Sequence, residues 1–437
     1  MNIILLSGGS GKRLWPLSND IRSKQFVKLF KDEFGKNESM VQRVYRQIKM
    51  VDANANITIA TSKTQASVIR NQLGENVSIC VEPCRRDTFP AIVLATAYLH
   101  DVYNVDKNES VIVCPVDPYV GQSYFETIYK LDELVQEGIA NITLMGINPT
   151  YPSEKYGYII PKDSGEISDV KEFKEKPDVE NAKKLLQQNA VWNAGVFAFK
   201  IEYLLKKAHS LLDFVDYYDL YEKYSTLKKI SFDYEIVEKE NRIQMMRYNG
   251  QWKDVGTWNM MAEVMSENSI GQAIIDDECV NTHVVNELNV PILAMGCKNM
   301  IIVAGRDGVL VSNKERSEYM KPYVERICDD IRYAEKSWGT YSVIDEGENS
   351  LTLKLLIKKG KSMSYHSHEF RKEVWTVISG KGIATIGDRN IEIKAGDNIC
   401  VKPGEKHMIS AKSDLEMIEV QIGSNITVDD KTKYERE

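Results

Sequence analysis

The chain opens on a short apolar run that stops at a cluster of glycines. Residues 2–6 read NIILL, and residues 7–11 read SGGSG. An apolar run of this length is typical of a strand buried on both faces of a parallel sheet. Three such runs follow, each preceded by a stretch with helical periodicity. The runs are residues 57–60, 111–113 and 142–145, and the helical stretches are residues 39–49, 91–102 and 124–136. This alternation predicts an α/β domain with a mostly parallel sheet.

The rest of the chain changes pattern twice. Residues 155–265 are mixed and are expected to add a lobe to the same sheet, whereas residues 270–315 hold short β-type pieces at close intervals. Such pieces indicate either a small β unit or the turns of a β-helix. A helical linker, residues 314–331, then leads to strands that alternate with Gly-bearing turns, as in an antiparallel barrel. We therefore predict three parts, residues 1–268, 269–332 and 333–437.

The charge balance limits the partners of such a chain. With 56 Lys and Arg against 63 Asp and Glu the net charge is -7, so no global basic field favours nucleic acid or an anionic membrane. The seven cysteines are scattered without a CxxC pair, which is typical of reduced thiols. The N-terminus lacks the basic region of a signal peptide, and no apolar run approaches the roughly 18 residues of a membrane helix. We expect a cytoplasmic protein that holds any anionic ligand in a local site.

The glycine-rich loop after the first run is the clearest candidate for that site. Glycines let backbone N–H groups approach a phosphate closely, and the Arg13 guanidinium adds a fork of donors. The loop has neither the GK[ST] of a Walker motif nor the GxGxxG spacing of dinucleotide-binding folds. Taken alone, it indicates either a polyphosphate site or a tight turn without a ligand.

The residues after the loop carry a family resemblance. Residues 15–18 read WPLS and residues 23–26 read SKQF. With the loop they resemble the sugar nucleotidyltransferases, in particular the mannose-1-phosphate guanylyltransferases, whose motifs read GGSGTRLWPLS and PKQF. Lys12 and Ser23 depart from that pattern.

The resemblance implies a Rossmann-like nucleotidyltransferase domain and assigns roles to the loop. Arg13 is expected to contact the triphosphate, and Lys24 is expected near the reacting phosphates; both are candidate catalytic residues. The other residues expected to bind the nucleotide here are Leu6, Gly8, Gly9, Ser10, Gly11 and Lys12.

A second segment resembles the part of the family that contacts the base and ribose. Residues 82–91 read EPCRRDTFPA and are similar to the family's EPxGRNTAPA. Asp87 stands where Asn is usual, and Cys84 and Arg85 replace another residue and a glycine, so the base preference is open between GTP and another nucleotide such as CTP. The resemblance implies nucleotide contacts from Glu82, Arg86, Asp87 and Thr88.

Two aspartates resemble the metal ligands of the family. Asp117 ends VCPVD, which resembles a strand-end PxD motif, and Asp254 lies in WKDVGTW, which resembles WxDVGxW. The resemblance implies that both bind Mg²⁺, which neutralises the phosphates and fixes an in-line geometry for attack on the α-phosphorus. Each aspartate taken singly also fits a strand-end cap or turn residue.

Three further motifs follow in the family's order and resemble its sugar site. They read YGYI from residue 156, FKEKP from residue 173 and WNAGVF from residue 192. The resemblance implies that Glu175 and Asn193 bind sugar hydroxyls, that Lys176 meets the sugar phosphate, and that Gly157 and Gly195 leave room for the ring. Without the resemblance, the last two motifs read as a charged strand end and an apolar core strand.

Three of the six histidines fall between residues 366 and 407, in a pattern that looks like the two cupin motifs. His366 and His368 are two apart and therefore lie on one face of a strand. Glu373 and His407 can complete an N₃O site for a divalent transition metal such as Zn, Mn, Fe, Ni or Co. The alternative is a polar barrel lining without a metal.

The fused barrel resembles the type II phosphomannose isomerase half of bifunctional enzymes, which supports mannose as the sugar. The match is partial, because the family's usual glutamine falls at His366 and two of its histidines become Glu369 and Phe370. The barrel is thus either an isomerase or a structural or regulatory cupin.

The leading prediction for function is transfer from GTP to mannose 1-phosphate, giving GDP-mannose and pyrophosphate for glycan or polysaccharide precursors. The alternatives are another nucleoside triphosphate with another sugar phosphate, a bifunctional isomerase, and a non-catalytic sensor. The short strands within residues 270–315 would offer an edge for a homodimer.

Overall fold

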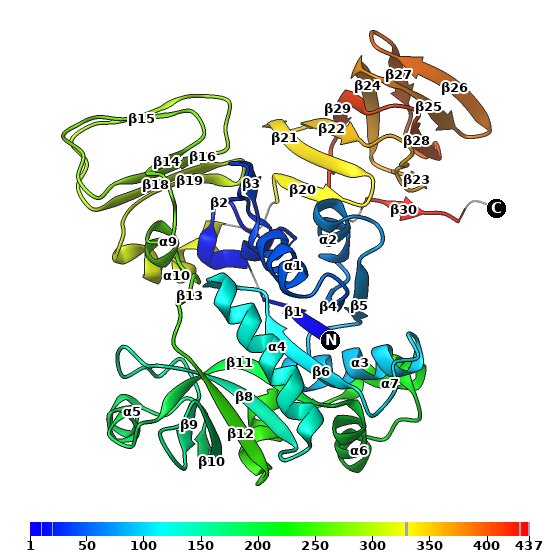
Figure 1. The fold of residues 1–437 in the computed structure, drawn as a ribbon. Coiled ribbons are helices and arrows are strands. Elements are labelled where there is room, and N and C mark those ends of the chain that lie inside the picture. The colour runs from blue at the N-terminus through cyan, green and yellow to red at the C-terminus, as the bar shows by residue number, and fades with distance from the viewer. Residues whose placement is uncertain (10, 20, 328–330, 428–429, 436–437) are drawn as a thin grey trace. The chain divides into compact units, whose positions relative to one another are not determined.

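The structure is a computed structural model that describes residues 1–9, 11–19, 21–327, 331–427 and 430–435 (Figure 1). The chain divides into two compact units. The first consists of Met1–Ser10 and Ser23–Glu267, and the second of Gly11–Arg22 and Asn268–Glu437. Within the described ranges no helix is long and apolar enough to cross a membrane. The predicted domain boundaries at residues 268 and 332 stay predictions.

The first unit is built on a nine-stranded sheet in the order β5-β4-β1-β6-β11-β8-β12-β10-β9. The strands are β1 Asn2–Ser7, β4 Asn56–Ser62, β5 Ser78–Glu82, β6 Ser110–Pro115, β8 Ile142–Ile147, β9 Tyr158–Pro161, β10 Ile167–Lys174, β11 Val191–Lys200 and β12 Ile243–Tyr248. The predicted α/β domain is confirmed, and the four runs read from the sequence are β1, β4, β6 and β8. Strands β1, β4, β5 and β6 pair in parallel, as do β8 and β12.

The lobe predicted for residues 155–265 makes this sheet mixed. Strand β11 is antiparallel to both β6 and β8, and β10 is antiparallel to β9 and β12. The loop between β9 and β10 is only residues 162–166. A connection this short joins antiparallel strands, because a parallel pair needs a crossover of a dozen or more residues.

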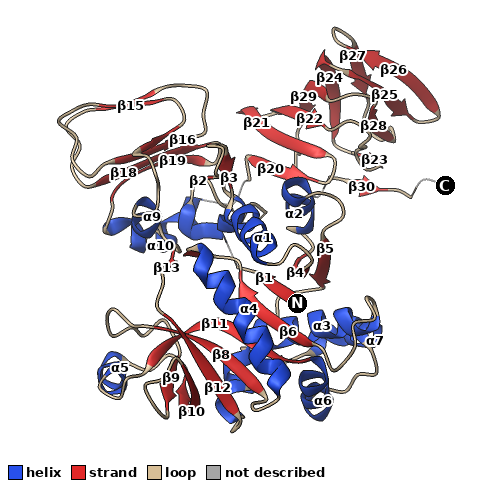
Figure 2. Ribbon diagram, in the orientation of Figure 1, coloured by secondary structure: helices blue, strands red, loops and turns tan. Residues whose placement is uncertain are grey.

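Helices cover the sheet of the first unit (Figure 2). The helices of this unit are α1 Met40–Val51, α2 Ala66–Leu73, α3 Thr88–Asp101, α4 Gln122–Glu137, α5 Val179–Leu186, α6 Ile201–Leu211, α7 Tyr217–Lys223, α8 Phe232–Glu235 and the short α9 Trp258–Ala262, which does not cover the sheet. Helix α3 is apolar on every side, and its residues from Phe89 to Ala97 are all buried, as expected of a helix enclosed by other elements. It packs with α6 in one large apolar cluster, whereas α4 packs against β6 and β8.

Small elements of the first unit lie beside the main sheet. A short antiparallel ribbon joins β7 (Pro118–Val120) to β13 (Trp252–Asp254), and Asp254 is directly opposite Pro118. A second ribbon joins β2 (Phe30–Lys31) to β3 (Asn37–Glu38). The 3₁₀ turns are η2 Lys24–Phe26, η3 Tyr224–Thr226 and η4 Val237–Lys239.

The second unit begins with stacked β rungs. They are β14 Ser269–Ile270, β15 Ala273–Ile275, β16 His283–Asn286, β17 Ile292–Ala294, β18 Met300–Gly305 and β19 Gly308–Asn313. Strands β14, β16 and β18 pair in parallel, as do β15 and β17, and β19 closes the stack by antiparallel pairing with β18. Parallel pairing of successive rungs is the arrangement of a β-helix, so the structure has the β-helical alternative.

Residues 11–22 belong to this second unit although they follow the glycine-rich loop. They include the 3₁₀ turn η1 (Gly11–Leu14). The Trp15 ring lies over Gly308, where a Cβ would come within 2.4 Å of it. Arg22 donates to both carboxylate oxygens of Glu287, at 2.7 and 2.9 Å. These contacts fix the segment on the β-helical rungs.

A helical linker and an all-β barrel complete the second unit. The linker is η5 (Arg316–Tyr319) and α10 (Lys321–Ile327), and the rest of its predicted length includes residues 328–330, outside the described residues. Two antiparallel sheets, in the orders β20-β21-β22-β29-β24-β27 and β26-β25-β28-β23-β30, enclose an apolar core, which confirms the predicted barrel. The strands are β20 Tyr333–Lys336, β21 Gly339–Gly347, β22 Ser350–Ile357, β23 His366–Ser367, β24 Arg371–Ser379, β25 Lys381–Ile386, β26 Arg389–Lys394, β27 Asn398–Val401, β28 His407–Ala411, β29 Leu415–Gly423 and β30 Thr432–Lys433.

Candidate functional site

The two predicted metal carboxylates lie together in the first unit. Asp117 follows the end of β6, and the pairing of Asp254 with Pro118 brings the second aspartate beside it. The Lys24 ammonium lies 2.9 Å from Asp117 Oδ2 and 3.9 Å from Asp254 Oδ1. All three side chains are partly open to solvent. Two carboxylates with solvent access suit Mg²⁺, which is commonly held by one or two carboxylates together with waters and substrate phosphates.

A cavity of about 210 Å³ joins these aspartates to the predicted sugar residues. The predicted residues that line it are Asp117, Gly157, Glu175, Lys176, Asn193, Gly195 and Asp254. The lining also includes Pro115, Pro118, Lys155, Tyr156, Ala194, Asp233 and Trp252, which the sequence reading did not assign. Residues from widely separated stretches of the chain therefore meet around one space.

Glu175 and Gly157 lie in close contact on one wall of the cavity. A Cβ at Gly157 would come within 2.5 Å of Glu175 Oε2 and 2.9 Å of the Phe173 ring, so a larger residue would displace the carboxylate. Glu175 is 7% exposed and accepts a hydrogen bond from Lys176 Nζ. Burial lowers the pKa of Lys176, but the hydrogen bond to Glu175 and the negative charges of Glu175 and Asp233 together outweigh it and leave that pKa raised. Lys176 has φ of 42°, a left-handed conformation that non-glycine residues seldom adopt outside constrained sites.

Asn193 and Asp233 form a second polar pair in the cavity. Asn193 Nδ2 donates to Asp233 Oδ1 at 2.7 Å, and Asn193 Oδ1 accepts from the Gly195 N–H at 3.0 Å. Burial raises the pKa of Asp233 to about 7, and the negative charge of Glu175 adds to the effect. Asp233 is on α8, outside the three motifs that indicated the sugar site. Its distance along the chain from Glu175 and Asn193 hides a proximity that only the fold creates.

The raised pKa of Asp233 predicts a stability effect with a defined sign. Folding favours the protonated carboxyl, so the fold loses stability as the pH rises from 3.8, the ordinary value, through about 7. The change Asp233→Asn removes this titration. We expect its denaturation midpoint to rise relative to the unaltered chain, by a margin that grows over that pH range and is constant above it. Thermal denaturation in a pH series measures this margin. Glu235→Gln, which alters the α8 carboxylate paired with Lys239, should give no growing margin; a flat difference for Asp233→Asn would contradict the assignment.

The glycine-rich loop is tied to buried residues of the first unit. Gly9 has φ of 112°, a backbone conformation that favours glycine, and its carbonyl accepts from Ser23 Oγ at 3.1 Å. Ser23 Oγ in turn accepts from Gln65 Nε2 at 2.6 Å. Ser23 and Gln65 are each 1% exposed. The serine at a position where the family pattern has proline therefore connects the loop to the residue just before α2 through a buried hydrogen-bond chain.

Replacing Ser23 by alanine should destabilise the protein. The change leaves the Gly9 carbonyl and the Gln65 amide without the bonds that Ser23 makes, at a cost of about 1–3 kcal/mol in the free energy of unfolding. Urea denaturation measures the loss. Ser62→Ala is a matched control, because its hydroxyl pairs with Thr64 near the surface, and its effect should stay within about 0.5 kcal/mol. Equal stability of the two variants would show that the hydrogen bonds of Ser23 contribute nothing measurable to the free energy of unfolding.

The remaining loop residues divide between the units. Leu6 is half-buried near the end of β1, before the buried Ser7, and its carbonyl accepts from Val116 N, while Gly8 and Gly9 are exposed. Lys12 is half-buried and Arg13 exposed, both in η1 of the second unit. Ser10 lies outside the described residues, and Gly11 begins η1. The nucleotide contacts assigned to these residues stay predictions.

The predicted base-side residues all have partners within the first unit. The Glu82 carboxylate accepts from the Tyr224 hydroxyl at 2.8 Å, and burial raises its pKa. Arg86 donates to the Ser225 carbonyl. Asp87 caps α3 by accepting from Thr88 N, and Thr88 Oγ1 accepts from Phe232 N, both at 2.8 Å. Their nucleotide contacts also stay predictions.

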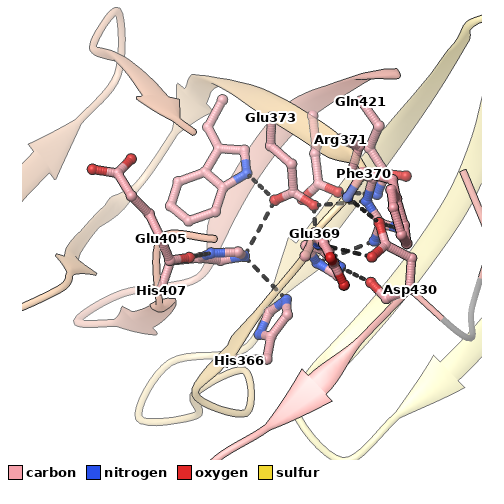
Figure 3. Close-up of polar contacts among 12 residues, drawn as sticks. His366, Glu369, Phe370, Arg371, Glu373, Glu405, His407, Gln421 and Asp430 are labelled. Carbon is pink, nitrogen blue, oxygen red and sulfur yellow. Dashed lines mark hydrogen bonds and ion pairs between the residues drawn. The ribbon is translucent and has the colours of Figure 1, made fainter. Parts of the chain in front are cut away.

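A second cluster lies inside the barrel. Figure 3 shows His366, His407 and Glu373 converging, each from a different strand. The Nε2 atoms of His366 and His407 are 3.1 Å apart, and Glu373 lies 3.5 Å from His407 Nε2 and 3.2 Å from His368 Nε2. The ligand atoms of the three histidines all lie within 4.8 Å of one another. The four predicted residues are therefore brought together.

The outer ring nitrogens fix the orientation of these histidines. His366 Nδ1 is 2.6 Å from the Ser364 carbonyl, His407 Nδ1 is 2.8 Å from the Glu405 carbonyl, and His368 Nδ1 contacts the Asp430 carbonyl. A carbonyl only accepts, so each Nδ1 carries the proton and each Nε2 directs a lone pair inward. Burial lowers the pKa of all three rings, to about 2 for His366. Neutral rings with facing lone pairs are the state in which imidazoles bind a metal.

Arg371 and Trp375 support the carboxylate of this cluster. Arg371 Nε and Trp375 Nε1 donate to Glu373 at 3.3 and 3.1 Å, and Arg371 Nη2 donates to His368 Nε2 at 3.1 Å. A carboxylate has about four lone-pair positions, so Glu373 can keep both bonds and still bind a cation. The Arg371 bond to His368 uses the lone pair that a metal would need. The three histidines and Glu373 therefore fit a transition metal if the ion displaces the Arg371 guanidinium from His368 Nε2.

Comparison with known proteins supports the division of roles between the two regions. A nucleotidyl transferase family model matches residues 2–269, and a model described as mannose-6-phosphate isomerase C-terminal matches residues 328–436. A mannose-1-phosphate guanylyltransferase of Salmonella montevideo is 28% identical over 99% of this chain and 98% of its own length. The xanthan biosynthesis protein XanB of Xanthomonas campestris pv. campestris (strain B100) is 29% identical over 99% and 97%.

A solved structure agrees with the fold. It comes from Thermus thermophilus and is described as a mannose-1-phosphate geranyltransferase. It is 27% identical, covers 74% of this chain and 98% of its own, and superposes with a TM-score of 0.62. The chain therefore belongs to the nucleotidyl transferase family, with a mannose-6-phosphate isomerase C-terminal domain following the transferase region as in the mannose-1-phosphate guanylyltransferases that it matches along its length.

Proposed function

We propose that this chain transfers a guanylyl group from GTP to mannose 1-phosphate, which yields GDP-mannose and pyrophosphate. The observation that carries the proposal is one cavity of the first unit, because the carboxylates Asp117 and Asp254 and the sugar-side residues line the same space. The full-length similarity to mannose-1-phosphate guanylyltransferases supports the choice of substrates.

The reaction needs no covalent intermediate with the protein. A phosphate oxygen of mannose 1-phosphate attacks the α-phosphorus of GTP, the bond to the β-phosphate breaks, and pyrophosphate leaves. The protein supplies positioning and charge, which are the main contributions in phosphoryl transfer. Glu175 and Asn193 would hold the sugar hydroxyls, and Lys176 would hold the phosphate of the sugar, in this cavity.

Asp117 and Asp254, which line the same cavity, would hold Mg²⁺. When bound, the ion neutralises phosphate charge and favours an in-line arrangement of the attacking and leaving oxygens. Lys24 is within ion-pair distance of both carboxylates and is therefore placed to contact the phosphates beside them. Arg13 and the loop glycines would bind the triphosphate.

Pyrophosphate release tests this proposal. The purified chain is offered GTP, CTP, ATP or UTP with Mg²⁺, each against mannose 1-phosphate and glucose 1-phosphate. We expect release with GTP and mannose 1-phosphate well above every other pair. Release with CTP and none with GTP would reject the guanylyl donor, and release with glucose 1-phosphate alone would reject the sugar.

The barrel favours a second candidate function, the interconversion of mannose 6-phosphate and fructose 6-phosphate. That reaction moves a proton between two carbons and needs groups that titrate near neutral pH. Burial raises the pKa of Glu419 to about 8 and lowers that of Lys431 to about 8, and both interact electrostatically with Glu373. Formation of mannose 6-phosphate from fructose 6-phosphate, in the presence of added Zn²⁺, Mn²⁺, Fe²⁺, Ni²⁺ or Co²⁺, tests this candidate. No conversion with any of these metals would leave the barrel with a structural or regulatory role.

A further inference from the structure

We propose that Asp233 is a specificity-determining residue that, together with Glu175, binds a pair of adjacent sugar hydroxyls in the cavity of the first unit. The proposal rests on the proposed function in one respect, namely that this cavity receives the sugar of a sugar phosphate. It adds a residue and a recognition chemistry that the sequence motifs did not assign.

Asp233 and Glu175 reach the same space from different elements. Asp233 is in α8, whereas Glu175 follows β10, and both line the cavity with Asn193. The bond from Asn193 Nδ2 uses one acceptor position of Asp233 Oδ1. A carboxylate offers about four such positions, so Asp233 can accept further hydrogen bonds from a ligand.

The charge environment distinguishes the two carboxylates. Glu175 is paired with Lys176. Among the described residues Asp233 takes part in no ion pair within 4.0 Å, although it is partly buried beside another carboxylate; the Lys176 ammonium attracts it only beyond that distance. A buried carboxylate that serves only the fold is ordinarily paired with a cation. The lack of an ion pair is instead expected where a polar ligand supplies donors, and the raised pKa of Asp233 supports this interpretation.

Sugar hydroxyls supply the donors that this arrangement lacks. Two carboxylates can accept from two neighbouring hydroxyls, so the binding affinity depends on both the presence and the relative orientation of these hydroxyls. Hydrogen bonds to charged acceptors are about twice as strong as neutral ones. A site built around such bonds rejects an analogue without the hydroxyl strongly, because the buried acceptor is then left unpaired.

Isothermal titration calorimetry with sugar phosphates tests the proposal without requiring turnover. Mannose 1-phosphate and its 2-, 3- and 4-deoxy analogues are titrated into the full chain and into the variants Asp233→Ala and Asp233→Asn. We expect each variant to bind mannose 1-phosphate about 10- to 100-fold more weakly, as for the loss of a charged hydrogen bond. One deoxy analogue should bind the unaltered chain more weakly by a similar factor and lose little more in Asp233→Ala, since the same bond is already absent.

The controls separate recognition from folding and from the proposed function. Glu235→Ala alters the other carboxylate of α8, which pairs with Lys239 at 2.8 Å outside the cavity, and should bind like the unaltered chain. Asp233→Asn keeps the size of the side chain, and its denaturation midpoint verifies folding. Unchanged affinity in folded Asp233→Asn and Asp233→Ala, or deoxy effects that add fully to that of Asp233→Ala, would overturn the proposal. Failure of GTP-dependent pyrophosphate release with normal sugar phosphate binding would instead reject the guanylyl transfer.

Discussion

Replacing Asp254 by alanine lowers the rate of pyrophosphate release by about three orders of magnitude or more. The expected loss follows from the position of the side chain, since Asp254 Oδ1 and Asp117 Oδ2 both lie within ion-pair distance of the Lys24 ammonium. Without Asp254, one carboxylate remains to hold Mg²⁺ against the phosphates. Metal stabilisation of developing charge amounts to several kcal/mol, and about 4 kcal/mol corresponds to a factor of about 1,000 in rate. Steady-state kinetics with GTP and mannose 1-phosphate measure the change.

The neighbouring residue provides the matched control for Asp254. Lys253 lies on the same strand β13 but pairs with Glu263 at 2.9 Å, away from the cavity lining. Its replacement by alanine should leave the rate within about twofold, because exposed ion pairs contribute little. Excess Mg²⁺ should recover part of the activity of Asp254→Ala if metal binding is what fails. Near-normal activity in Asp254→Ala at ordinary Mg²⁺ would refute the metal assignment.

The main parallel strands of the sheet could be predicted, but the meeting of Asp117 with Asp254 could not. The apolar runs that became β1, β4, β6 and β8 are visible because a buried parallel strand needs continuous apolar residues. The proximity of Asp117 to Asp254 depends on the pairing of β7 with β13, two three-residue strands more than 130 residues apart. Strands this short leave no periodic signal. Only the resemblance placed both aspartates in one site.

The positions of Asp233 and of residues 11–22 could not be predicted from the sequence, for different physical reasons. Asp233 lies in a four-residue helix, and its distance along the chain from Glu175 and Asn193 hides the contact. Residues 11–22 follow the glycine-rich loop, so proximity along the chain suggested that they belong with it. They cluster with the second unit because Trp15 and Arg22 find their contacts on the β-helical rungs, at Gly308 and Glu287. In both cases contacts with residues far away along the chain, and not the local sequence, determine where these residues lie.

Replacing His407 by alanine abolishes the binding of a transition metal to the barrel. In the unaltered chain we expect about one equivalent of a divalent ion per chain after loading with Zn²⁺ or Mn²⁺ and removal of the excess. The reason is geometric: the Nε2 atoms of His366 and His407 are 3.1 Å apart with their protons on Nδ1, so their lone pairs repel unless a cation lies between them. Atomic emission spectroscopy measures the metal content directly.

The role of His407 as a metal ligand also sets the size of the expected loss of metal binding. Loss of a group that merely orients a ligand weakens metal binding about 10- to 100-fold, so loss of a ligand itself should exceed that range. Bound metal stabilises the fold by mass action, so a chelator should lower the denaturation midpoint of the unaltered chain and leave that of His407→Ala unchanged. His209→Ala removes a histidine that stacks on Phe214 in the first unit, and it should keep the metal. A metal-free unaltered chain, or full occupancy in His407→Ala, would favour the polar lining, in which the Arg371 guanidinium keeps the lone pair of His368 and takes the place of a metal cation.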